Sequence, residues 1–133
     1  MLAQQHRMRT SVQFSMTTRS GVRSGRRNLV LYVLLTHNSS PSISGFVVSK
    51  AVGNAVMRNL VKRRLRELVA ETIKWNPCGM SIVVRALPAS ANASWDDLVG
   101  DYRSAWSSIQ RKLEVPESGS VQACEPRQAG TPQ

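Results

Sequence analysis

The sequence has 133 residues, of which 41% are hydrophobic and 20% charged, and its formal net charge at pH 7 is +10. This length favours a single domain with a modest core that needs no disulfides. The longest apolar run, residues 29–35, is too short to span a membrane. A signal peptide is not expected either, because the basic amino terminus is not followed by an apolar stretch. Cys78 and Cys124 lie far apart, which fits neither a disulfide framework nor a metal site and favours reduced thiols in the cytoplasm.

The charge is distributed unevenly along the chain. Residues 1–66 contain twelve Lys or Arg and no Asp or Glu, whereas residues 67–133 contain six bases and eight acids. Like charges at this density repel one another until a polyanion binds them. The first half of the chain therefore predicts a nucleic acid partner, whose phosphates release counterions on binding.

A basic lead, residues 1–9, precedes a predicted short helix. Thr10 or Ser11 can cap this helix, which is expected to end near Thr18. The next segment, residues 21–28, is predicted to be a basic loop or an edge strand.

Two strands are predicted next. Residues 29–36 are apolar at successive positions, which favours a central strand with a covering helix on at least one side. A turn rich in Ser and Asn follows, and residues 43–49 are predicted to form a second strand antiparallel to the first.

A long helix is predicted from Asn54, a suitable N-cap, to Trp75, where Asn76-Pro77 stops it. Residues 80–86 then form a strand, and the helix makes a parallel β-α-β unit with residues 43–49 plausible. On the helix an apolar stripe is expected to pack on the core, opposite a basic face. The stripe comprises Met57, Val61, Leu65, Leu68 and Trp75, and the basic face comprises Arg58, Asn59, Lys62, Arg63 and Arg66.

A last helix is predicted from Ser94, with Asp97 completing a capping box, to about residue 113. The tryptophans Trp75, Trp95 and Trp106 are expected in the core. Residues 114–133 are polar and rich in Pro, Ser and Gly, which predicts a disordered tail after a domain of residues 1–113. The pattern indicates an α+β fold, with one sheet of about four strands and helices packed on it.

No catalytic constellation is evident in the sequence. His6 and His37 have no partner at a recognisable spacing, so they are interpreted as exposed side chains. Asp97 and Asp101, one helical turn apart, could share a magnesium ion, but a cap and a solvated carboxylate are the simpler interpretation. We therefore expect a protein that binds nucleic acid for a reactive centre located elsewhere.

The order of Arg58-Asn59 and Lys62-Arg63, preceded by Ser49-Lys50 and Gly53-Asn54, resembles the arginine-rich signature of the bacterial ribonuclease P protein subunit. The resemblance extends over residues 5–113 and includes Arg7-Met8-Arg9 and Phe14. The chain departs from the family pattern at Leu60, Ala51 and Thr18. Each departure removes one RNA contact that the resemblance would imply.

The resemblance implies an α-β-β-β-α-β-α order with a left-handed β-α-β crossover, which the general handedness rule would not predict. It also implies that the protein binds a catalytic RNA and the 5′ leader of precursor tRNA, in a complex of one protein with one RNA subunit. No membrane partner is implied. The catalytic centre would lie in the RNA, where magnesium ions would be held by RNA and substrate. The implied RNA-binding residues are Arg7, Arg9, Phe14, Tyr32, Lys50, Arg58, Asn59, Lys62, Arg63 and Arg66.

Several alternatives stay open at the level of sequence. Phe14 and Tyr32 could stack on RNA bases or pack in the core. Arg64, at the border of the apolar stripe, is expected to snorkel or to pair with an acid. A general RNA-binding or ribosome-associated module would share the charge asymmetry, a self-sufficient nuclease would need no RNA subunit, and a basic amphipathic helix could bind an anionic membrane.

Overall fold

The computed structural model describes residues 6–36 and 40–113, so His37 and the predicted tail lie outside the described residues. The element order confirms the predicted succession α-β-β-β-α-β-α, with one short 3-10 helix, η2, that the sequence did not predict. The elements are α1 (Ser11–Ser20), β1 (Val22–Gly25), β2 (Leu29–Leu35), β3 (Ile43–Val47), α2 (Ala55–Trp75), β4 (Met80–Ala86), η2 (Pro88–Asn92) and α3 (Trp95–Leu113).

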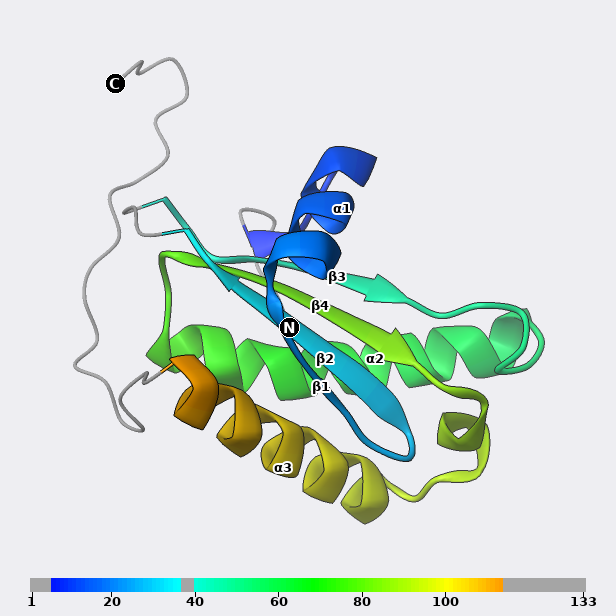
Figure 1. Ribbon diagram of the computed structural model, residues 1–133. Coiled ribbons are helices and arrows are strands. Elements are labelled where there is room, and N and C mark those ends of the chain that lie inside the picture. Colours follow the sequence, from blue (N-terminus) through cyan, green and yellow to red (C-terminus); the bar gives the residue numbers. More distant parts are fainter. Residues whose placement is uncertain (1–5, 37–39, 114–133) are drawn as a thin grey trace.

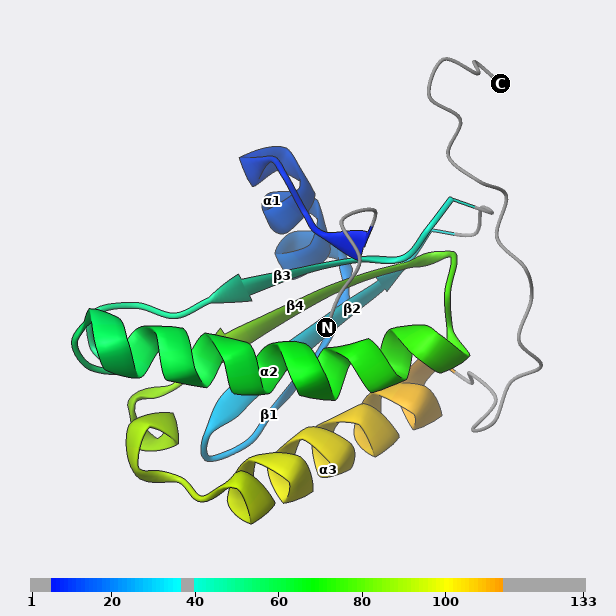
Figure 2. The ribbon, with the colours of Figure 1, turned by 180° about the vertical axis from the view of Figure 1, so that it is seen from behind.

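The four strands form one mixed sheet in the order β1-β2-β4-β3. β2 pairs with β1 and β4 in antiparallel fashion, and β3 pairs with β4 in parallel. The strand β3 runs antiparallel to β2 as predicted, but β4 lies between them. With α2 in front of the sheet (Figure 2), β3 runs toward the left and β4 lies below it, so the β3-α2-β4 crossover is left-handed.

Helices cover both faces of the sheet (Figure 1), with α1 on one face and α2 and α3 on the other. The central strand β2 is apolar at every position because it is covered on both sides. Leu29, Leu31 and Val33 belong to the main core with α2 and α3, whereas Val30 and Tyr32 belong to a smaller cluster beneath α1. The prediction of a central strand with a covering helix on at least one side is confirmed.

Side-chain caps fix the start of each long helix. Thr10 caps α1 in a capping box with Gln13, and the Asn54 side chain accepts a hydrogen bond from the Met57 N–H at 3.0 Å. Ser94 Oγ accepts from the Asp97 N–H at 3.0 Å, and an Asp97 carboxylate oxygen accepts from the Ser94 N–H at 3.3 Å. The three predicted caps are therefore confirmed, and each satisfies amides that a helix leaves unpaired.

Two expectations about burial were wrong. Trp75 and Trp95 are 48% and 38% exposed, and only Trp106 packs against the main core. Trp75 is at the last turn of α2, where it lines the groove between α2 and α3. His6, interpreted as exposed, is half-buried, and its Nδ1 lies 2.5 Å from the Ser42 carbonyl oxygen. Nearby, the Met8 N–H donates to the Ser44 carbonyl at 2.8 Å.

Among the described residues, no helix is long and apolar enough to cross a membrane.

A buried hydroxyl pair joins α2 to α3. The Tyr102 and Thr72 hydroxyls lie 2.7 Å apart, and burial raises the pKa of Tyr102 above its usual range. The folded protein thus keeps this proton at a pH where the unfolded chain loses it, so stability should fall as pH rises above about 10. We expect Tyr102→Phe to lower the free energy of unfolding by about 1 kcal/mol at neutral pH and to reduce the alkaline loss. Urea titrations at pH 7 and about pH 10.5 measure both effects, and an unchanged alkaline loss would contradict this assignment.

Candidate nucleic-acid interface

The sequence predicted all the basic residues of α2 on the face opposite its core-facing stripe, but three of them lie on a flank of that stripe. Arg58, Lys62 and Arg66, each one turn apart, are half-buried, whereas Asn59 and Arg63 are exposed. At about 100° per residue the three half-buried cations form a ridge along one flank of the helix. We call Arg58, Lys62 and Arg66 the α2 ridge. Long cationic side chains often bury their aliphatic stems and keep their charged ends in water, but at Arg58 the burial includes the guanidinium Nε.

The α2 ridge lies on the side of the molecule where the sheet ends at β3. The opposite flank of α2, which includes Leu68, Thr72 and Trp75, faces α3 across a shared groove. Because α3 contacts β1 and β2 while α2 contacts β3, the flank away from α3 follows the outer edge of the sheet. The ridge is therefore beside the outer side of β3, away from β4.

Three further predicted cations reach the same edge. The bridge between Arg7 and Ser44 places the lead along β3, and Arg9 follows it immediately before α1. Lys50 lies after β3 in the exposed turn that leads into α2, where its carbonyl accepts a hydrogen bond from the Gly53 N–H at 3.2 Å. Residues far apart in the sequence thus form one cationic border along β3, which we call the β3 edge.

The aromatic candidates Phe14 and Tyr32 lie in one cluster between α1 and the sheet. Tyr32 is 9% exposed and Phe14 is half-buried, and both contact the cluster around Val30 and Val83. The Phe14 ring rests directly on Gly45 of β3, because a Cβ built at Gly45 would lie 2.5 Å from Phe14 Cε1. Both aromatics thus contribute to packing, and Phe14 also keeps a solvent-accessible surface beside the β3 edge.

Sequence reasoning omitted two sheet cations from the site, Arg85 and Arg23, and Arg85 is the more informative. It is the exposed member of the otherwise buried strand β4 and stands opposite Val30 of β2 and Val47 of β3. Alternation places it on the α1 face of the sheet, as it does Arg23, which is exposed and opposite Tyr32. The available signal was a single charged residue in an otherwise apolar strand, because core packing does not explain a charge at such a position.

Two cations that contributed to the predicted charge are occupied within the fold. Arg26 donates to the Ser104 hydroxyl and carbonyl of α3 at 3.0 and 3.2 Å. Arg64 donates to the Ala93 carbonyl at 3.3 Å, so it neither snorkels freely nor pairs with an acid. These arginines hold the fold together and are not part of the β3 edge.

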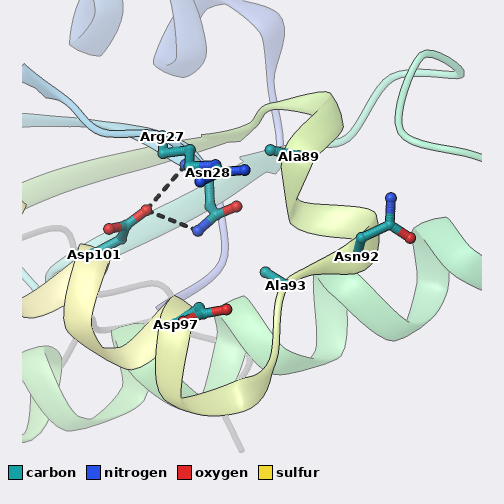
Figure 3. Close-up of a pocket in the computed structure, with 7 residues that line it drawn as sticks. All are labelled: Arg27, Asn28, Ala89, Asn92, Ala93, Asp97 and Asp101. Atoms are coloured by element: carbon teal, nitrogen blue, oxygen red, sulfur yellow. Dashed lines mark hydrogen bonds between the residues drawn. The ribbon is translucent and has the colours of Figure 1, made fainter.

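The possible metal pair Asp97 and Asp101 borders a hollow of about 300 Å³ (Figure 3), together with Arg27, Asn28 and the end of η2. Asp101 accepts hydrogen bonds from the Asn28 backbone and side-chain amides at 3.0 and 2.9 Å, so it is not the merely solvated residue we had expected. Asp97 is engaged in the α3 cap. Within the described residues no group of three or more His, Cys, Asp or Glu is arranged to hold a metal ion.

The departure at Leu60 offers a direct test of the interface. Leu60 is half-buried but belongs to neither apolar cluster, and it lies on α2 next to exposed Asn59. We expect Leu60→Arg to strengthen RNA binding by about 1 kcal/mol, the value of one charge-assisted contact, at an unchanged thermal midpoint. Affinity and midpoint measured on the same variant check this, and a large fall in midpoint without tighter binding would contradict it.

Comparison with known proteins identifies the family. The family model described as Ribonuclease P matches residues 2–110. A relative from Arthrobacter sp. (strain FB24), named Ribonuclease P protein component, is 54% identical over 134 residues, which cover 99% of this chain and 98% of the relative. A relative of the same name from Kocuria rhizophila is 62% identical over 112 residues, covering 84% and 98%.

Solved structures agree in fold. The Staphylococcus aureus RNase P protein at 2.0 Å is 23% identical, with a TM-score of 0.62 and coverage of 83% of this chain and 96% of that one. The Thermotoga maritima RNase P protein in complex with 1-(4-fluorophenyl)-2-thiourea is 20% identical, with a TM-score of 0.62 and coverage of 77% and 98%. With the match over residues 2–110 and the identity to its relatives, the chain belongs to the ribonuclease P protein family.

Proposed function

We propose that this protein is the protein subunit of ribonuclease P, in which it binds the catalytic RNA and the 5′ leader of precursor tRNA to promote removal of the leader. The observation that carries the proposal is the β3 edge, where cations from the lead, the turn before α2 and the α2 ridge meet beside an aromatic cluster. Cations of this density neutralise phosphates, and an adjacent aromatic surface suits unpaired bases.

We assign a different RNA ligand to each side of the β3 edge. The α2 ridge, Asn59, Arg63 and Lys50 engage the catalytic RNA, where Asn59 can both donate to and accept from a sugar or base edge. On the α1 face, Phe14 and the two sheet arginines Arg23 and Arg85 hold the extended leader, and buried Tyr32 belongs to the cluster on which Phe14 packs. Arg7 and Arg9 lie between the two surfaces and serve either strand.

The chemistry of cleavage takes place in the RNA. Asp97 and Asp101 have hydrogen-bonding roles in the fold, so we assign magnesium to RNA and substrate phosphates. The protein's cations reduce the repulsion between crowded phosphates. By binding the leader, the protein also holds the precursor tRNA in position for cleavage. We place this complex, one protein with one RNA, in the cytoplasm.

Reconstitution tests the proposal. The purified protein alone should not cleave precursor tRNA, because its described residues hold no convergent acid, base and metal group. Added to a bacterial ribonuclease P RNA, it should lower the magnesium concentration needed for half-maximal cleavage at the 5′ end of the mature tRNA. Metal-dependent cleavage by RNA-free protein would favour a self-sufficient nuclease. An unchanged magnesium requirement, with a footprint not confined to the leader, would favour a general RNA-binding module.

A further inference from the structure

A groove between α2 and α3 lies away from the β3 edge and is lined by acidic and aromatic side chains, whereas the β3 edge is cationic. The two helices lie side by side on the same face of the sheet (Figures 1 and 2), and the groove between them has a volume of about 440 Å³. All three tryptophans of the chain, Trp75, Trp95 and Trp106, line it. Two of them are among the most exposed large apolar side chains of the described residues.

Three carboxylates of the groove have no partner among the residues that the structure describes. Of the eight acids in the sequence, five lie within those residues, and Asp97 and Asp101 are engaged as described above. The other three, Glu67, Glu71 and Asp96, all line the groove and form no hydrogen bond or ion pair with any described side chain. Arg103 is the one cation among the twelve lining residues. Among the described residues of this strongly basic protein, the unpaired carboxylates thus lie beside the tryptophans.

Carboxylates and indole rings together recognise organic cations. The faces of Trp attract ammonium groups, and nearby carboxylates add Coulomb attraction, whereas the same carboxylates repel nucleic acid. Glu67 and Glu71 are one helical turn apart, a spacing of about 5–6 Å between Cβ atoms that suits amines joined by a short methylene chain. The methylene chain can rest on the indole faces.

The size of the groove favours a small ligand. A volume of about 440 Å³ falls in the range of small-molecule sites, which is roughly 300–1,000 Å³. A stable protein partner would normally contact about 20–30 residues on this side, many more than the twelve that line the groove. We infer that the α2-α3 groove is a binding site for an aliphatic polyamine of the spermidine type.

Tryptophan fluorescence reports on this site alone, because all three tryptophans of the chain line the groove. Spermidine titrated into the RNA-free full-length protein at constant ionic strength should change the tryptophan emission saturably, and calorimetry should give one site per chain. The double variant Glu67→Gln/Glu71→Gln should bind more weakly, by roughly two- to fivefold per carboxylate removed. Sodium chloride or magnesium chloride at matched ionic strength should not reproduce the change.

The neighbouring residues Asp96 and Asp97 supply a matched control. Asp96→Asn and Asp97→Asn remove the same charge from the same helical turn, but only Asp96 lines the groove. We expect Asp96→Asn alone to weaken spermidine binding, while an amide oxygen at position 97 can still accept the capping bond. Equal effects of the two variants would overturn the proposal. So would a change that simple salt reproduces, or binding of a lysine-rich peptide without binding of spermidine. Because the titration contains no RNA, its failure would leave the proposed ribonuclease P function intact.

Discussion

Replacing Arg58, Lys62 and Arg66 together by Ala should weaken binding of the catalytic RNA by about 3 kcal/mol, on the order of a hundredfold, if each cation makes one charge-assisted contact. The slope of log affinity against log salt should become shallower by roughly 0.7–0.9 for each phosphate that the variant no longer neutralises. The α2 ridge justifies this expectation because its cations share one flank of α2 beside the β3 edge. Filter-binding affinities at several salt concentrations measure both quantities.

The matched control removes the same charge from elsewhere. Lys74, Arg103 and Arg111 are exposed on the last turn of α2 and on α3, away from the β3 edge. Replacing these three by Ala lowers the net charge by the same amount as the ridge variant. It should therefore weaken only the long-range attraction between protein and RNA, and the slope of log affinity against log salt should not change. Arg58 Nε is buried without a hydrogen-bond partner among the described residues, so circular dichroism must confirm that the ridge variant is folded. Equal salt slopes for the two triple variants would show that the ridge is only a solvated face.

Local sequence signals predicted the elements well where they were strong. The strand β4 begins at Met80 and ends at Ala86 as predicted, because Pro77 and Gly79 break the chain before an uninterrupted apolar run. Asn54 caps α2 as expected. The parallel pairing of β3 with β4, which the helix between them made plausible, is confirmed. The position of β4 between β2 and β3 was not predicted, since strand order depends on contacts distant in sequence. The left-handed crossover came only from family resemblance, because chain chirality favours the other hand.

The candidate site was predictable in its charge but not in its geometry. The cations of α2 were recognised from the sequence, yet periodicity alone could not show that they flank the stripe beside the sheet edge. Charge counting also could not separate Arg26 and Arg64, which donate to backbone carbonyls, from cations left for RNA. Trp75 and Trp95 were assigned to the core because they lie near an apolar stripe or a helix start, but the groove between α2 and α3 leaves them exposed.

Gly45 should be a sensitive position on the α1 face. A Cβ there would lie 2.5 Å from Phe14 Cε1 and 2.9 Å from Met8 Sδ, so Gly45→Ala must displace both side chains. Overpacking of this kind costs about 1–3 kcal/mol of unfolding free energy. Since Phe14 joins α1 to the sheet, the variant should also bind the precursor leader more weakly, while the α2 ridge keeps its affinity for the catalytic RNA. Denaturant titration and binding of precursor and mature tRNA to the reconstituted enzyme measure the two effects.

A double-mutant cycle with Phe14→Ala isolates the contact. Removing the ring frees the space that the new methyl group needs, so Gly45→Ala should cost less in the Phe14→Ala background, by an interaction energy of about 1 kcal/mol or more. Gly100→Ala is the matched control, because a Cβ at that position of α3 meets nothing within 4 Å and Ala favours the helix by about 0.5–1 kcal/mol. We therefore expect Gly100→Ala to raise the thermal midpoint and Gly45→Ala to lower it. If Gly45→Ala costs the same with and without the Phe14 ring, then the ring does not rest on β3, and the leader surface assigned to the α1 face loses its structural basis.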